Sequence, residues 1–318
     1  MATETATSTL RHVSPKLIDR NPENPRLLFR QAEFDQLLES IRRFGIQVPL
    51  VVYREGDRFV LIDGERRWRC ALKLNLDRVP TMIQEKPTPL NNLLLMFNIH
   101  ALREQWDLLT IALKLPRIIR LLTRQNGSRP TERELSEHTG LPRGLIRRCR
   151  LLMDLPQEYK DIILAELKKP KQQQRLTEDL FIELERALTT LERAMPRVVG
   201  DRDNARQVLL DKFQRGVIGN RVHFRYLAKM ARVKNVSSDT RPAERAVAQV
   251  LARGNDYSLE SAYNDSVSEA YAERDVQTRV SGLIERLSHI HPRELDDTLR
   301  SSLEKLVARI RQVLSRSR

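Results

Sequence analysis

Residues 61–69 read Leu-Ile-Asp-Gly-Glu-Arg-Arg-Trp-Arg, an apolar run that ends at a glycine and continues into three arginines. The apolar run is typical of a β-strand, and the residues after Gly64 favour a helix. A glycine lets a ligand approach the backbone closely, and the first N–H groups of a helix point outward at the positive end of its dipole. Because guanidinium groups bind phosphate through paired hydrogen bonds, we expect an anion site here. The candidate residues are Gly64, Glu65, Arg66, Arg67 and Arg69.

Three arginines at the start of a helix also fit a solvated surface or a contact with nucleic acid. The helix dipole favours negative charge at the N-terminus, so a cluster of cations is unfavourable there unless an anion binds. The position of the arginines therefore favours an anion site over a solvated face.

The sequence around this stretch predicts a small domain of mixed strands and helices. Residues 49–53 and 59–62 are β-rich runs, and the turn-forming residues 54–57 between them predict a hairpin. Apolar residues recur at helical spacing over 34–41, and residues 79–83 supply another short strand.

Past Pro89 the apolar pattern is helical, so we predict an α+β fold in which a small mixed domain precedes a largely all-α region. Predicted helices include 93–102, 108–124, 131–139 and 142–153. Pro116 is expected to kink or divide the second of these, and polar connectors are expected at 168–175 and 231–245. The predicted organisation is a flexible tail (1–10), a mixed nucleotide-binding domain (11–88), a helical domain (89–156), a helical region of unknown role (157–275) and a basic amphipathic C-terminal helix (276–318).

The C-terminal helix carries an apolar stripe at alternating four- and three-residue steps, the spacing of a helix–helix contact. The stripe consists of Leu299, Leu303, Leu306, Ile310 and Val313. It can pack on the chain's own core or on a second copy of the chain, and little more than two heptads are present, so both alternatives stay open.

Residues 130–154 predict a helix, a turn and a second helix, which is the helix-turn-helix pattern of DNA-binding proteins. Thr131 and Glu134 have the spacing of a capping box, and Gly140 permits a left-handed turn. Between residues 114 and 154 ten Lys and Arg meet four Asp and Glu, a local charge of +6. The alternative is a basic surface helix in an ordinary bundle, but cap, turn and basic face together favour DNA. The candidate DNA-binding residues are Arg143, Arg147, Arg148 and Arg150.

Composition agrees with a nucleic-acid partner. The 318 residues include 56 Lys and Arg against 42 Asp and Glu, a formal charge of +14 that favours polyanions. No apolar run approaches the ~18 residues of a spanning helix, so no membrane partner is expected. The first ten residues lack the features of a secretory signal, which favours a cytoplasmic location. Cys70 and Cys149 have no CxxC or histidine partner and are expected to be buried free thiols.

Four stretches together resemble, in the same order, the sulfiredoxin-like N-terminal domain of the ParB family. They are Asn21-Pro-Glu-Asn-Pro-Arg26, the helix with Ile41 to Gly45, the strand Pro49 to Val52 and Asp63-Gly-Glu-Arg-Arg-Trp-Arg-Cys-Ala71. In that family the Gly-Glu-Arg-Arg-x-Arg stretch holds the triphosphate of CTP, so the resemblance implies CTP binding by the five residues of the anion site named above. With the helix-turn-helix included, the resemblance spans about half the chain.

A second family stretch, Glu-Asn-x-x-Arg, helps to hold phosphate and Mg²⁺, and the resemblance implies Asn98 and Arg103 for this role. Phe97 stands where the family has the glutamate. An aromatic ring has no oxygen to offer a hard cation, which counts against Mg²⁺ binding and CTP hydrolysis. Glu104 is the alternative carboxylate in this stretch.

The resemblance implies a sequence-specific DNA-binding protein that binds CTP and acts in the partition of a chromosome, plasmid or mobile element. It also implies a homodimer that closes around DNA, a ParA-type ATPase as partner, and association with the nucleoid or plasmid. The alternative is a helix-turn-helix transcription regulator that works without nucleotide. A nuclease or kinase on the same fold is less consistent with the sequence, which offers no cluster of Asp, Glu or His for two-metal chemistry.

Overall fold

The computed structural model describes residues 9–24, 31–98, 106–290 and 296–316. The chain divides into two compact units, residues 1–186 and 187–318. The domain boundaries drawn from the sequence at 88, 156 and 275 stay predictions. In the described part of the chain, no helix is both long enough and apolar enough to span a membrane.

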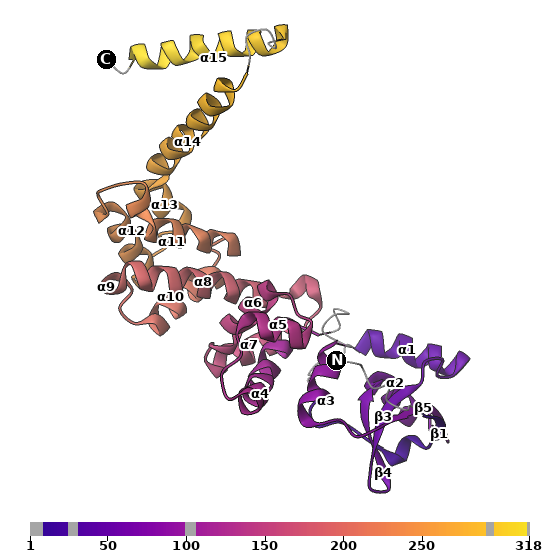
Figure 1. Ribbon diagram of the computed structural model, residues 1–318. Coiled ribbons are helices and arrows are strands. Elements are labelled where there is room, and N and C mark those ends of the chain that lie inside the picture. The colour runs from indigo at the N-terminus through magenta and orange to yellow at the C-terminus, as the bar shows by residue number, and fades with distance from the viewer. Residues whose placement is uncertain (1–8, 25–30, 99–105, 291–295, 317–318) are drawn as a thin grey trace. The chain divides into compact units, whose positions relative to one another are not determined.

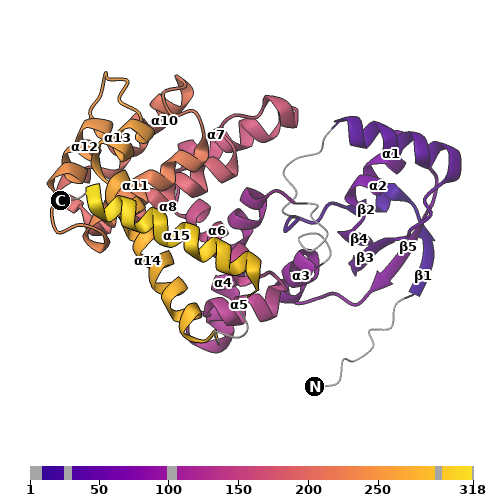
Figure 2. The ribbon, with the colours of Figure 1, turned by 90° about the horizontal axis from the view of Figure 1, so that it is seen from above.

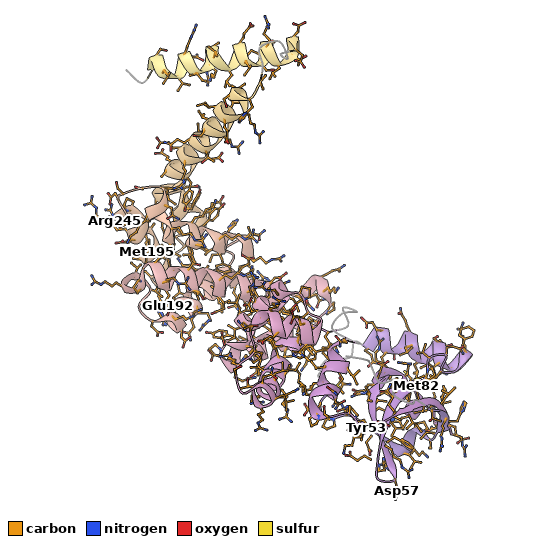
Figure 3. The ribbon with its side chains drawn as sticks, in the orientation of Figure 1. Tyr53, Asp57, Met82, Glu192, Met195 and Arg245 are labelled. Atoms are coloured by element: carbon orange, nitrogen blue, oxygen red, sulfur yellow. The ribbon has the colours of Figure 1, made fainter. Side chains whose placement is uncertain are left out.

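Unit 1 begins with a five-stranded mixed sheet whose strand order is β1-β5-β3-β4-β2. The strands are β1 (Thr9–Val13), β2 (Ile18–Asp19), β3 (Leu50–Glu55), β4 (Arg58–Asp63) and β5 (Val79–Gln84). β3 and β4 form the predicted antiparallel hairpin, and Asp57 lies in the turn at its tip (Figure 3). β5 pairs parallel with β3 and antiparallel with β1, whereas β2 pairs parallel with β4.

Two helices, α1 (Gln31–Phe44) and α2 (Glu65–Lys73), lie on the same side of this sheet (Figures 1 and 2). Ala71 of α2 packs with Leu50, Val52 and Leu61 of the strands to form the main core. On its other side, α2 uses Cys70 to pack against α1. The apolar pattern read from the sequence therefore places the start of α2, with its arginines, at the end of β4 and beside α1.

Two strands and the limits of the tail differ from the prediction. Thr9 and Leu10 belong to β1, although the sequence assigned them to the flexible tail. β1 is exposed along most of its length, so it lacks the alternating pattern by which a strand is recognised. β2 has only two residues, Ile18 and Asp19, which is too short for any periodicity.

The remainder of the chain is helical, and the predicted α+β fold is confirmed. In unit 1 the further helices are α3 (Pro89–Met96), α4 (Leu108–Asn126), α5 (Glu132–Thr139), α6 (Arg143–Met153) and α7 (Gln157–Leu167). Helix α8 (Glu178–Ala194) contains the boundary between the units. Unit 2 continues with α9 (Pro196–Val199), α10 (Arg202–Gln214), α11 (Phe224–Ala231), α12 (Arg241–Leu251), α13 (Leu259–Ser266), α14 (Ser268–Ser288) and α15 (Asp297–Arg316). Short 3-10 turns are η1 (Pro15–Leu17), η3 (Lys171–Gln173), η4 (Arg221–His223) and η5 (Val233–Asn235).

Two prolines act differently from the prediction. Pro116 lies inside α4, which continues on both sides of it, so of the two predicted outcomes, a kink or a division, the division is wrong. A proline inside a helix costs about 3 kcal/mol, and the long buried face of α4, from Leu108 to Leu122, offsets that cost. Pro242 lies in the first turn of α12, where its missing N–H has no helical partner to lose. The connector predicted at 231–245 therefore ends before Arg241.

The C-terminal segment is also different, because α14 ends at Ser288 and α15 begins at Asp297, whereas a single helix was predicted. The predicted apolar stripe lies on α15. Its side chains are largely exposed, with Ile310 43% and Val313 54% exposed. In this chain the stripe is therefore not covered by the core.

Both cysteines are free and buried, as predicted. Burial raises the pKa of the Cys149 thiol to about 12, and burial likewise raises the pKa of Cys70. The reactive thiolate is thus disfavoured at both positions.

Candidate functional site

The backbone at Gly64 has a conformation that side chains rarely adopt. Its φ is 100°, and a Cβ added there would lie 2.6 Å from Leu50 Cδ2 and 3.2 Å from Arg67 Nη2. Gly64 is also the N-cap of α2, and the first helical hydrogen bond is donated by the Trp68 N–H to the Gly64 carbonyl. The N–H groups of the three residues between them precede that bond, which is the arrangement expected of a helix N-terminus that binds an anion.

Arg67 folds back over this glycine and is bound within the domain. Its Nη1 donates to the carbonyls of Val48, at 2.5 Å, and Pro49, at 2.8 Å, while its Nη2 donates to Asp63 Oδ2 at 2.9 Å. These contacts connect the start of α2 to the residues before β3 and to the end of β4. Arg67 therefore holds the turn around Gly64 in place.

Arg66 and Arg69 bind two different glutamates. Arg66 donates to Glu33 of α1, through the carboxylate at 3.3 Å and the carbonyl at 2.7 Å. Arg69 donates to Glu65 Oε1 at 2.5 Å, and Arg20 reaches the same oxygen at 3.1 Å. The Glu65 side chain is only 3% exposed, so its charge is neutralised by the two arginines around it.

The structure corrects one step of the sequence argument. The three arginines of the motif were expected to need an anion because a helix N-terminus disfavours cations. Instead Glu33, Asp63 and Glu65 each pair with one of them. The charges are compensated within the protein, so charge alone does not require a ligand. An anion would have to compete with these carboxylates.

A segment that the sequence argument did not place at the site lies beside Glu65. Asn24 Nδ2 donates to Glu65 Oε2 at 2.5 Å, and buried Asn21 shares an amide hydrogen bond of 3.1 Å with Asn92 of α3. Glu23 pairs with Arg117 of α4, at 3.2 Å, and with Lys114 of the same helix, at 3.9 Å. Residues 21–24 thus contact α2, α3 and α4 together. The Asn-Pro-Glu-Asn stretch carried the family resemblance, but sequence alone does not reveal partners so distant along the chain.

The second predicted phosphate stretch is only partly described. Phe97 is fully buried and meets Trp106 edge-on, with 5.2 Å between the ring centroids. Asn98 is exposed in the turn that follows α3, whereas Arg103 and Glu104 lie outside the described residues. Within the residues that the structure covers, no group of three or more His, Cys, Asp or Glu side chains is placed to hold a metal ion.

Helices α5 and α6 form the second candidate site. The predicted capping box is confirmed: Glu134 N–H donates to Thr131 Oγ1 at 3.2 Å, and Thr131 N–H donates to the Glu134 carboxylate at 2.7 Å. Gly140 ends α5 with a φ of 71°, as expected for a left-handed turn. α6 packs against α4 and α5 through its buried side chains Ile146, Cys149 and Leu152.

The four predicted DNA-binding arginines are not equivalent. Arg143 is exposed, and no ion pair is recorded for it in the described part of the chain. Arg147 and Arg150 share one carboxylate, that of Glu132 on α5, each at 3.1 Å. Arg148 pairs instead with Asp179 of α8. Arg143, Arg147 and Arg150 follow a helical spacing of four and three, so they lie along one face, and Arg148 lies off that face.

Comparison with known proteins confirms the predicted resemblance. Residues 1–97 match the family model described as the ParB N-terminal domain. The chain is 30% identical over 156 residues to a probable chromosome-partitioning protein ParB from Pseudomonas putida, covering 48% of this chain and 51% of that protein. It is 31% identical over 159 residues to a nucleoid occlusion protein from Geobacillus kaustophilus, covering 49% of this chain and 53% of that protein. The chain thus matches about half the length of these relatives.

Among solved structures, the C-terminally truncated ParB of Caulobacter crescentus matches in two complexes. In complex with the centromeric parS site it is 20% identical with a TM-score of 0.44, covering 70% of this chain and 99% of that one. In complex with CTP-γ-S it is 23% identical with a TM-score of 0.29, covering 56% of this chain and 92% of that one.

Proposed function

We propose that this chain, in which a ParB-type N-terminal domain precedes a helix-turn-helix, is a sequence-specific DNA-binding protein that binds CTP and acts in DNA partition. The observation that carries the proposal is the intact motif from Gly64 to Arg69 at the start of α2, in a domain that matches the ParB N-terminal family. The relatives include both partitioning and nucleoid occlusion proteins, and partition is the role we propose.

In this proposal α5 and α6 are the helix-turn-helix, and α6 enters the major groove of DNA. Arg143 and Arg147 lie near the N-terminus of α6, where a reading helix contacts base edges. Arg147 is 59% exposed and pairs with the partly buried carboxylate of Glu132, a bond that a DNA phosphate can replace. Arg148 would act on the packing between α6 and α8 and would not contact DNA.

The nucleotide would bind at α2. A triphosphate that reaches the helix N-terminus competes with Glu33 for Arg66 and with Glu65 for Arg69, two partly exposed arginines. Arg67 would stay with Asp63 and keep the turn at Gly64 in shape. CTP is proposed because the family holds CTP with this motif. Mg²⁺ is not part of the proposal, because the ring at Phe97 offers no oxygen ligand.

The proposal includes a homodimer formed through α15, with a ParA-type ATPase as the family-implied partner. The apolar stripe of α15 is exposed, and burying it would remove apolar surface from water. We expect Leu306→Glu with Ile310→Glu to shift the full chain toward monomer in sedimentation velocity, relative to Arg309→Glu on the same helix. A dimer that persists unchanged would contradict this contact.

Equilibrium binding of labelled CTP to the purified chain tests the nucleotide part. ATP and GTP serve as competitors, with and without Mg²⁺ and with DNA from the chain's own locus. We expect selective CTP binding that Arg67→Ala abolishes, while Arg42→Ala, which removes an exposed arginine of α1, leaves it unchanged. The absence of nucleotide binding under every condition would refute the nucleotide part and leave the DNA part standing.

A second function is favoured by one observation, the burial of Phe97 against Trp106 where the family has its glutamate. This contact is consistent with a transcription regulator that kept the fold and binds DNA without nucleotide. The two functions differ in one measurement, because only the first predicts that CTP changes the affinity or lifetime of the DNA complex.

A further inference from the structure

Unit 2 contains a cavity of about 260 Å³ between α10 and the loop that follows α12. α10 contributes Gln207, Asp211, Lys212 and Arg215 to its lining, and the loop contributes Arg253 and Gly254. Three of these side chains are cationic and one is anionic. The cavity wall is therefore positively charged.

Lys212 is a buried cation whose hydrogen-bond partners are neutral. The residue is 1% exposed, and its Nζ donates to Asn255 Oδ1 and to the Tyr257 carbonyl, each at 2.8 Å. Burial, followed by the charge of Arg215, lowers its pKa, and the charges of Asp256 and Asp211 oppose this shift. A buried ammonium group is ordinarily paired with a carboxylate, because an unpaired charge is costly in a poorly solvated environment. No such ion pair of Lys212 is found among the residues described. Its third N–H donor is not used by the two bonds.

Arg253, which lines the cavity from the loop after α12, is exposed and also binds a neutral partner. Its Nε donates to Asn204 Oδ1 at 3.0 Å, and its Nη2 donates to the same oxygen. Arg215 is different, because it binds two carboxylates, those of Asp211 and Asp256. The charge of Arg215 is thus satisfied within the protein, whereas neither Lys212 nor Arg253 forms an ion pair with the residues that the structure describes.

We propose that this cavity binds a phosphate group between Lys212 and Arg253. An ammonium group from α10 and a planar guanidinium group from the loop after α12 match an anion with several acceptor oxygens. The volume accommodates inorganic phosphate with room for a small substituent. The phosphate can come from a free anion or from the backbone of DNA bound to the protein, and the experiment separates the two.

The full chain is titrated with inorganic phosphate against sodium chloride of equal ionic strength, without DNA. For a free anion we expect phosphate at about ten times its Kd to raise the melting temperature by about 2–4 °C, and the Gly254 amide resonance to shift saturably. Arg253→Gln should abolish both responses. Arg241→Gln, which replaces an exposed arginine of α12 paired with Asp239, should preserve them. Lys212→Met is a second test, although loss of its buried bonds can destabilise the fold.

DNA binding by the same variants tests whether the phosphate comes from the backbone of DNA. If phosphate has no effect on the wild type but Arg253→Gln weakens DNA binding about tenfold and Arg241→Gln does not, the cavity takes a backbone phosphate of DNA. If phosphate responses are unchanged by Arg253→Gln and DNA affinity is unchanged as well, the proposal is wrong.

Discussion

The two arginine-rich helices, α2 and α6, use the same residue type in different surroundings. Arg67 of α2 is 19% exposed and donates three hydrogen bonds to its own domain, whereas Arg147 of α6 is 59% exposed and shares a single glutamate. Arg67 therefore holds a shape, whereas Arg147 carries charge that a ligand can use. An arginine motif in a sequence does not by itself distinguish these roles, and the partners of each guanidinium group do.

The largest effect should come from α6. Replacing Arg143 and Arg147 together with alanine should weaken DNA binding about 100-fold and reduce the slope of log affinity against log salt by about 2, because two contacts to DNA are lost. Fluorescence anisotropy across a salt series measures both quantities. Arg133→Ala on α5, which removes another exposed arginine, is the matched control. If the double variant binds as the wild type does, α6 does not read DNA.

On α2 the expected effect is on stability. Arg67→Ala removes the donor from two carbonyls and one carboxylate, so we expect the free energy of unfolding to fall by about 2 kcal/mol. Urea denaturation measures this change. Arg147→Ala should change the same quantity by less than about 0.5 kcal/mol, because its ion pair is exposed. Equal losses for the two variants would remove the distinction between the helices.

The packing behind α6 should respond to pH through Glu178, the neighbour of Asp179, which pairs with Arg148. Burial raises the pKa of Glu178 to about 6, the Leu109 N–H bond opposes this rise, and Asp107 adds to it. The folded state then binds more protons than the unfolded state between about pH 4.5 and 6. Stability from this group is therefore present below that window and is lost as pH rises through it, by about 1–2 kcal/mol.

Glu178→Gln is the test of this pH dependence. The glutamine has no charge to gain between pH 4.5 and 6. The unfolding free energy at pH 6 minus that at pH 4.5 should therefore be about 1–2 kcal/mol more positive in the variant than in the wild type. Glu158→Gln, on α7, controls for the general effect of removing a carboxylate. An unchanged pH profile in the first variant would show that Glu178 titrates in the ordinary range.

The smallest predicted effect sharpens the account of α6. Glu132→Gln removes the carboxylate shared by Arg147 and Arg150, so we expect DNA affinity to rise about threefold to fivefold. Anisotropy at low salt is sensitive enough to measure it. Glu137→Gln, whose partner Arg133 lies elsewhere on α5, should have less effect. A decrease in affinity would mean that Glu132 positions the arginines for binding.

Local signals account for what the sequence predicted correctly. The hairpin of β3 and β4, the glycine before α2 and the capping box of α5 each depend on residues within a few positions of one another. The arginine motif was found in the same way. Its spacing placed Arg66, Arg67 and Arg69 on the first turns of a helix.

Contacts between distant residues account for what the sequence did not predict. The pairing of Arg66 with Glu33, and of Arg20 with Glu65, joins residues more than thirty positions apart. The spacing of residues along the sequence does not reveal such pairs. Without them, the arginines of α2 were expected to need an anion. Similarly, helical spacing places Arg148 off the face of Arg147, but the sequence does not reveal its partner, Asp179 on α8.

Residues 21–24 connect the two arginine helices, because they contact α2 directly and reach α6 through α4. Asn24 binds Glu65 at α2, and Glu23 binds α4, the helix against which α6 packs. If a ligand at α2 changes the affinity of α6 for DNA through this segment, then DNA must change the affinity of α2 for that ligand by the same factor. One four-residue segment can thus set how strongly two binding equilibria are coupled, without contributing contact energy to either.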